Sequence, residues 1–366
     1  MIRDATNSRE AKTIHRQKWS FTLRHLTGGP IVRVLFVIIA LLVLGRIVSP
    51  GFLSLSNIGN VLASSTILAV AALGQILVIV GGGEGIDLSV GSVVSLGAIL
   101  GGVFSLGSNS HVLSALAILV TVGGLIGLIN GLGVRIMGIP PLVMTLGMSS
   151  VVDGFVLAYT QGQPGGGAPP ILLSLGSGHL LPGIRWLAIC GFGVVIIGSL
   201  ILSRSRYGRQ LQLTGSNRQA ARLSGINVSR IVVASYVMAG VFSAVAGYML
   251  LGLAGSSDLG IGSSYTLLSI AAVVIGGTQL SGGEGSYIGA ALGSVALVIL
   301  TNVLVAFRLN SGAREFFEGL ALVVILVAYT QSWQRRRSLD QFSRESKRIG
   351  VGPESTESTG TEESME

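Results

Sequence analysis

The sequence predicts an all-α polytopic membrane protein with about ten transmembrane helices. Only 11% of its 366 residues are charged, 49% are hydrophobic, and long apolar runs recur along the chain. A soluble chain carries about 25% charged residues, so this chain lacks the charges that a water-facing surface needs. The apolar runs have the length of roughly 20 residues that a helix needs to cross hydrocarbon.

Ten segments have the composition of membrane spans, although the boundary between the eighth and the ninth stays open. They are Ile31–Ser49, Ile58–Val80, Leu88–Leu106, Val112–Ile136, Leu142–Thr160, Ile184–Ser203, Ile231–Ala254, Tyr265–Gly277, Tyr287–Phe307 and Phe316–Ser332. We therefore expect a basic N-terminal segment (1–30), a transmembrane domain (31–332) containing a polar loop (204–230), and a polar tail (333–366).

Glycine marks both breaks and packing faces within the apolar part. Backbone breaks at membrane depth are tolerated only when they are buried in protein or line a wet cavity. Glycines spaced four apart let helix backbones approach closely. The breaks are Gly81–Gly85, Gly165–Gly167 and Gly282–Gly285, and the ladders are Gly123, Gly127 and Gly131, and Gly285, Gly289 and Gly293. The stretches 81–97 and 276–293 show a weak mutual likeness.

The basic residues predict the orientation. With the N-terminus inside, 20 of the 24 Lys and Arg residues fall on the cytoplasmic side, as the positive-inside bias requires. Both termini and the polar loop are then cytoplasmic, and residues 161–183 face outward. The tail from Gly350 to Glu366 has five acids and no base, which indicates a disordered solubilising or regulatory segment. The lone Cys190 excludes a disulfide within the chain, and no cleavable signal is evident.

Motifs of catalysis and nucleotide binding are missing. The three lysines, Lys12, Lys18 and Lys347, do not follow a glycine-rich phosphate loop. The four histidines are scattered without metal-ligand spacing. We therefore expect no catalytic residues, no metal and no cofactor. The net charge of +8 reports topology rather than nucleic-acid binding.

Four polar residues are candidates for a translocation path. Asp153 lies about two thirds along the fifth span, where a carboxylate costs roughly 3 kcal/mol, so we expect it in the bundle interior or an outer vestibule. It is either a proton relay, a structural acid or a substrate contact. Asp87 can cap a helix that starts at Leu88. Gln75 and Asn130 can hydrogen-bond a hydroxylated substrate or a neighbouring helix.

The polar loop contains a short helix signature in TGSNRQAARLSGINVSR, residues 214–230. Ser216 with Gln219 forms a capping box, and Gly225 is a suitable stop. Ala220, Ala221 and Leu223 offer a small apolar surface. Such a short helix either docks in the groove of a partner or forms part of an ordinary connection.

This loop resembles the cytoplasmic loop of the ribose-type sugar permeases of ATP-binding-cassette (ABC) importers. The pattern G-x-N-x-x-A-A-x-x-S-G-I-x-V matches at Gly215, Asn217, Ala220, Ala221, Ser224, Gly225, Ile226 and Val228. GIDLSVGSVVSLGA (85–98), IPPLVMTLGM (139–148) and SIAAVVIGGTQLSGGEGSYIGAALG (269–293) are similar to further family segments, in the same order.

The resemblance implies a type II ABC importer-like bundle in a bacterial inner membrane. A second permease subunit, a cytoplasmic ABC ATPase that binds the ATP, and a periplasmic or lipoprotein sugar-binding protein are the implied partners, beside membrane lipid. The implied coupling loop comprises Gly215, Ser216, Asn217, Ala220, Ala221, Arg222, Leu223, Ser224 and Gly225, and we expect Ala221 and Arg222 to face the ATPase.

Departures from the family pattern at Tyr265, at Asp153–Gly154 and before Ile86 argue against ribose itself as the solute. A monosaccharide or similar polyol is the expected substrate. The alternatives are an ABC permease for a branched amino acid or nucleoside, an ion-coupled secondary transporter that depends on Asp153, and an intramembrane enzyme.

Overall fold

The computed structural model describes residues 30–181 and 183–310, together with 312–314, 316–317, 319–320 and 323–324. The chain up to Glu318 forms one unit, to which all the elements below belong. In its described part, seven helices are long and apolar enough to cross a membrane. They are α2 (Pro30–Val48), α3 (Leu55–Val80), α5 (Val112–Arg135), α6 (Pro141–Thr160), α8 (Trp186–Arg204), α11 (Val228–Ala254) and α13 (Tyr287–Ala306). The prediction of a helical polytopic membrane protein is confirmed.

Two of the expected spans are shorter than predicted. α4 (Val90–Ser105) has 16 residues and α12 (Tyr265–Ile275) has 11. At 1.5 Å per residue they are about 24 Å and 16 Å long, less than the roughly 30 Å of hydrocarbon. One of the predicted glycine breaks lies a few residues before α4, and another a few residues after α12. The tenth expected span, the N-terminal segment and the tail lie largely or wholly outside the described residues.

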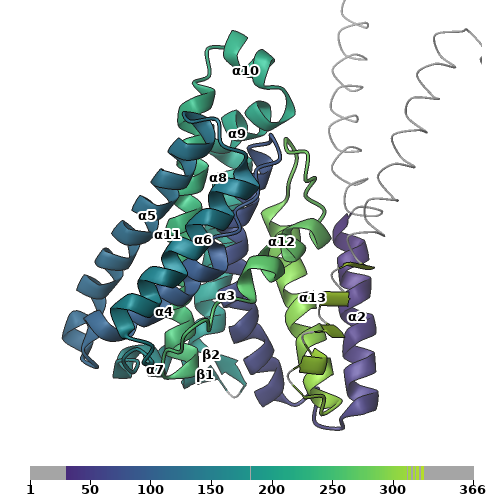
Figure 1. Cartoon of the computed structure of the whole chain (residues 1–366). Helices are drawn as coiled ribbons and strands as arrows, with labels where there is room; N and C mark the ends of the chain where they lie inside the picture. The colour runs from purple at the N-terminus through teal and green to yellow at the C-terminus, as the bar shows by residue number, and fades with distance from the viewer. Residues whose placement is uncertain are drawn as a thin grey trace, which may run out of the picture. The chain divides into compact units, whose positions relative to one another are not determined.

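The connections also contain regular structure. The loop at 161–183 holds α7 (Pro170–Ser177) and β1 (His179–Leu181), which pairs antiparallel with β2 (Ile184–Arg185); the short 3-10 helix η1 (Asn109–His111) precedes α5. The polar loop holds α9 (Arg206–Ser216) and α10 (Arg218–Leu223). Figure 1 shows α9 and α10 at the opposite end of the bundle from α7 and the β1–β2 pair. The two loops therefore lie at opposite ends of the bundle, as expected when its helices cross a membrane.

The central helix is α3, which packs against α8, α11, α12 and α13 (Figure 1). Of its most apolar 18-residue window, 94% is buried. Two polar side chains in it are satisfied within the helix, because Ser65 Oγ and Thr66 Oγ1 donate to carbonyls four residues back, at 2.7 Å and 3.0 Å. A helix without charges and with its two buried hydroxyls paired can lie in the middle of the bundle.

Both glycine ladders make close helix contacts. A side chain on Gly127 would collide with the Tyr236 carbonyl, and a Cβ on Gly131 would lie 2.9 Å from Val233 Cα, so α5 packs directly on the α11 backbone. Gly289 and Gly293 likewise face the α12 backbone. The prediction of close helix packing is confirmed for the first ladder and for Gly289 and Gly293. Gly285 precedes α13 and lies outside the helices.

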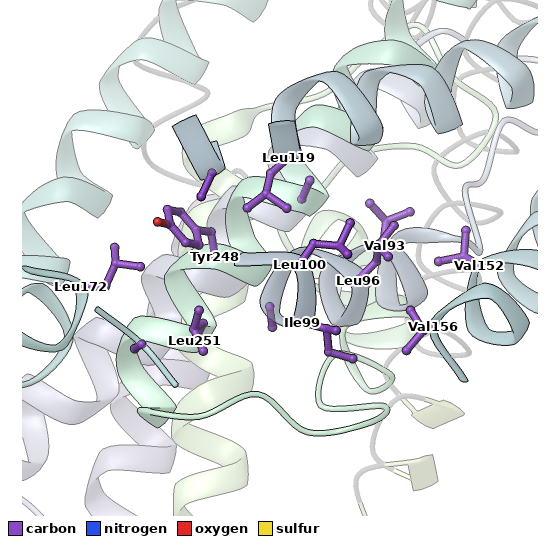
Figure 2. Close-up of a cluster of buried hydrophobic side chains, with 14 residues drawn as sticks. Val93, Leu96, Ile99, Leu100, Leu119, Val152, Val156, Leu172, Tyr248 and Leu251 are labelled. Atoms are coloured by element: carbon purple, nitrogen blue, oxygen red, sulfur yellow. The ribbon is translucent and has the colours of Figure 1, made fainter. Parts of the chain in front are cut away.

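A large apolar cluster holds the helices together at the end of the bundle that carries α7. Figure 2 shows that α4 supplies much of it, with side chains from α5, α6, α7 and α11 around it. Its labelled residues are Val93, Leu96, Ile99, Leu100, Leu119, Val152, Val156, Leu172, Tyr248 and Leu251. This packing fixes α4 so that the segment preceding it projects into the bundle.

Candidate functional site

Three of the predicted path residues meet inside the bundle. In the amide orientation that satisfies both of its atoms, Gln75 on α3 donates to the Asp87 carbonyl at 3.2 Å and accepts from the Asp87 N–H at 3.3 Å. Asp87 Oδ1 accepts from the Ser89 N–H at 2.9 Å and the Ser89 hydroxyl at 2.6 Å. Asn130 Nδ2 on α5 donates to Ser89 Oγ at 3.0 Å. One polar network therefore links α3, the break before α4, and α5.

Two threonines hold the same break from other helices. Thr145 Oγ1 on α6 accepts from the Leu88 N–H at 3.0 Å, and Thr266 Oγ1 on α12 accepts from the Gly91 N–H at 3.0 Å. Backbone that is not helical at membrane depth must be satisfied by protein. Gln75, Thr145 and Thr266, from three helices, do this for the backbone of residues 87–91. Neither threonine was a sequence candidate.

The network is closed in this conformation. Gln75, Asp87 and Asn130 are each at most 1% exposed. Within the described residues, Asn130 Oδ1 is buried without a hydrogen-bond partner. The expectation that Asp87 caps a helix starting at Leu88 is wrong. α4 begins at Val90, and the Asp87 carboxylate bonds Ser89, the residue directly before this helix. The reason is that the side-chain contacts hold residues 86–89 out of the helix.

Asp153 does not join this network. It lies on α6, where the buried residues are Thr145, Val152 and Val156, and its own side chain is exposed. The expectation that it points into the interior of this chain's bundle is therefore wrong. α6 packs on α4 and α5 with its other face, so a carboxylate at this position points away from the chain.

The second group of candidates surrounds α9. Its first turn is capped by Ser205, whose Oγ accepts from the Gly208 N–H at 2.9 Å. Leu211 is fully buried, and a Cβ on Gly81 would meet its Cδ1 at 3.3 Å. Gly215 lies so close to the Val80 carbonyl and to Gly283 N that it has no room for a side chain. The polar loop is thus anchored on the end of α3.

Two breaks with the same sequence, Gly-Gly-Glu-Gly at 82–85 and at 282–285, meet beneath this loop. Gly82 and Gly282 have φ values of 75° and 88°, in the region that favours glycine. A side chain on Gly282 would collide with Gly82 Cα. The Gly283 N–H donates to the Val80 carbonyl at 3.0 Å. The weak likeness noted in the sequence therefore corresponds to two loops in direct contact.

α10 is capped at both ends. Asn217 Oδ1 accepts from the Gln219 and Ala220 N–H groups, at 2.9 Å and 3.0 Å. The predicted capping box at Ser216 is wrong, because Ser216 is the last residue of α9 and its hydroxyl donates to Gln212 O at 2.8 Å. Asn217 caps α10 because it has the extended backbone of an N-cap residue, whereas Ser216 is still part of the helix α9.

The predicted stop at Gly225 is confirmed. Its φ is 77°, its N–H donates to the Arg222 carbonyl, and the Ile226 N–H donates to the Ala221 carbonyl, both at 3.0 Å. These two bonds form a Schellman motif. Ile226 also packs on the cluster that contains Ala221. Two caps and an apolar contact hold in place a helix too short to persist alone.

The faces of α10 differ from the prediction in one respect. Ala221 is fully buried against Val78 of α3 and several α11 side chains, so the expectation that it faces a partner is wrong. Arg222 is exposed, and so is Leu223, at 85% of its surface. Ala220 is half-buried, and Gly215 is half-buried in α9. The outward face comprises Ser216, Asn217, Gln219, Arg222, Leu223, Ser224 and Gly225.

Arg218 is a further contact that the sequence did not single out. Its Nη2 donates to the Gly82 carbonyl at 3.0 Å, which ties α10 to the first break. Burial lowers the pKa of the Arg218 guanidinium, and the positive charge of Arg135 lowers it further. No sequence signal marks Arg135 and Arg218 as neighbours, because only the packing of α5 and α11 brings them together.

The fold and these two sites define a helical membrane subunit with a buried polar network and a rigid surface helix at one end. Residues 57–329 match the family described as the branched-chain amino acid transport system / permease component. The chain belongs to this family of transport permeases and is a multi-pass protein of the bacterial inner membrane.

Curated relatives are similar over most of their length. The autoinducer 2 import system permease protein LsrC of Enterobacter sp. (strain 638) is 37% identical over 279 residues, which cover 76% of this chain and 80% of that protein. The ribose import permease proteins RbsC of Escherichia coli (strain K12) and Haemophilus influenzae are 34% and 32% identical, covering 80% and 81% of this chain and 91% and 92% of theirs. No solved structure matches the chain.

Proposed function

We propose that this chain is the permease subunit of an ABC importer for a monosaccharide or a similar polyol. The relatives named above are import permeases for ribose and autoinducer 2, and together they support a small hydroxylated solute. The network of Gln75, Asp87 and Asn130, closed in this conformation, contains amide and carboxylate groups of the kind that bind hydroxyls when a path opens. The chain itself uses no cofactor in this proposal, since ATP is bound by a separate ATPase subunit.

The single observation that carries the coupling role is the rigid presentation of α10. Its back is buried through Ala221, both ends are capped, and Leu223 is 85% exposed beside Arg222. An apolar side chain so exposed on a held helix suits a groove on a cytoplasmic ATPase. Movement of that groove would reach the bundle through Arg218 and the two Gly-Gly-Glu-Gly breaks.

A second permease subunit, identical or related, covers the outer face of α6 in this proposal. The exposed Asp153 carboxylate would cost roughly 3 kcal/mol against lipid. Gly147 and Gly154, seven residues apart on the same face, have no atom within 4 Å of a Cβ built on them. Small residues on a helix face permit close approach of another helix in the membrane. Asp153 then remains a candidate for the path, but between two subunits. This gives a type II importer-like arrangement, to which a periplasmic or lipoprotein binding protein delivers the solute.

The test is transport by the complete system in proteoliposomes. The chain is purified by affinity from its native membrane and the copurifying ATPase subunit is identified by mass spectrometry. Uptake of labelled ribose and of related sugars is then measured without an ion gradient. ATP is supplied on the side of the membrane where the ATPase subunit is bound. Leu223→Asp should release the ATPase and abolish uptake, whereas Leu213→Asp, a change at a 39% exposed leucine on α9, should not.

Each alternative predicts a different result. Uptake driven by an ion gradient without any ATPase would establish a secondary transporter. ATP-driven uptake of branched-chain amino acids but of no sugar would keep the ABC class and overturn the substrate. An ATPase that still copurifies and couples normally with Leu223→Asp would contradict the docking role of α10.

A further inference from the structure

A polar cavity of about 150 Å³ lies between the start of α10 and the Gly82–Gly85 break. Its polar side chains come from three separate elements: Arg135 at the end of α5, Arg218 at the start of α10, and Tyr236 in the first third of α11. The exposed residues Gly83, Gly138 and Pro140 lie on its lining, so the cavity opens at the end of the bundle that carries α10. A single water needs only about 15 Å³ of such space, so the cavity has room for a polyatomic ion.

The polar groups of this cavity lack partners. Arg135 Nε, Arg218 Nε and Tyr236 Oη are all buried, and none has a hydrogen-bond partner within the described residues. Arg218 uses one other donor, Nη2, on the Gly82 carbonyl. Buried donors without acceptors are costly, and they are normally satisfied by water or by a bound ion.

The positive charge of the cavity lining also lacks a negative partner. Two guanidinium groups line the cavity, and its lining within the described residues contains no acid. Two acids flank the glycine part of the lining. Glu84 is exposed, and Asp87, whose charge is felt at Tyr236, lies outside the lining with Oδ1 bonded to Ser89. Two like charges that share a partly buried cavity repel each other unless an anion lies between them.

We propose that this cavity is a binding site for a phosphate-class oxyanion, supplied either as free phosphate or as the headgroup of an anionic lipid. Guanidinium groups present paired N–H donors that match the oxygens of such an anion, and the tyrosine hydroxyl adds a donor from a third direction. An anion held by Arg135 and Arg218 joins α5 to α10 and so fixes the helix against the bundle. The site is independent of the solute that is transported.

The experiment is a phosphate titration of the full-length chain in nanodiscs of zwitterionic lipid, at constant ionic strength adjusted with chloride. The readout is the midpoint temperature of unfolding, which rises as a ligand binds the folded state. We expect a saturable rise. Tyr236→Phe, which removes only the hydroxyl, should weaken the apparent affinity about tenfold, and Arg135→Gln or Arg218→Gln at least as much. Arg206→Gln, at an exposed arginine of α9, should leave it unchanged.

A second arm distinguishes the source of the phosphate group. In nanodiscs containing phosphatidylglycerol and no free phosphate, a midpoint already raised relative to Tyr236→Phe, with no further response to phosphate, identifies the lipid headgroup. The proposal is overturned if neither phosphate nor phosphatidylglycerol raises the midpoint of the wild-type chain. It is also overturned if Tyr236→Phe and both arginine variants keep the full response, or if acetate protects as well as phosphate.

Discussion

Arg218 Nη2 donates to the carbonyl oxygen of Gly82 at 3.0 Å, although 136 positions separate the two residues in the chain. This bond joins the surface helix α10 to the break that leads into the buried network. A side chain on Gly82 would meet Gly215 Cα at 2.7 Å, and a side chain on Gly282 would collide with Gly82 Cα. The region around α10 is therefore a tight stack of loops, in which α9 and α10 contact both breaks.

Gly215→Ala tests this stack. The added methyl group overlaps the Val80 carbonyl and Gly283 N, and overpacking of this kind costs about 1–3 kcal/mol of the free energy of unfolding. Thermal unfolding of the purified chain should show a lower midpoint. Gly193→Ala on α8, where a Cβ meets no atom within 4 Å, is the matched control and should not lower it. Equal midpoints for the two variants would contradict the contact.

Asn217→Ala tests which residue caps α10. Loss of the two side-chain bonds to the Gln219 and Ala220 amides should cost about 1 kcal/mol. Hydrogen exchange of the α10 amides should then become about fivefold faster. Ser216→Ala, which removes the residue that the sequence pattern favoured, should leave exchange in α10 unchanged. The opposite ranking of the two variants would restore the capping box.

Thr145→Val tests the support of the break before α4. The isosteric change leaves the partly buried Leu88 N–H without its acceptor, which costs about 1–3 kcal/mol. The unfolding midpoint should fall, and solute uptake should fall with it because the network around Asp87 loses its position. Thr121→Val, at an exposed threonine of α5, should change stability by less than about 0.5 kcal/mol.

Cross-linking tests the face of α6. In a Cys190→Ser background, which removes the chain's own exposed thiol, Gly154→Cys should give a covalent dimer with a short bis-maleimide in native membranes. Gly193→Cys lies on α8, at another position with open space around it, and should remain monomeric. Dimers from Gly193→Cys alone would place the second subunit on α8. If the partner is a related chain, Gly154→Cys should instead yield a mixed product once that chain also carries a cysteine.

The sequence by itself determined the seven long spans of the described chain. α5, α6 and α13 begin and end within one residue of the predicted bounds Val112–Ile136, Leu142–Thr160 and Tyr287–Phe307. The physical reason is that lipid leaves the backbone no partner but itself, so a long apolar run has one stable outcome. The Gly225 stop and the two glycine ladders were also predictable, because each depends on backbone space that only glycine provides.

The tertiary structure alone decided which faces meet. A helix that is apolar all round gives no signal for the side that it buries, so the sequence could not place Asp153 outward on α6 or bring Gln75, Asp87 and Asn130 together. α10 was misjudged for a related reason. A six-residue helix has no orientation of its own, and the contact of Ala221 with Val78 and α11, made across distant parts of the chain, turned Leu223 and Arg222 to the surface.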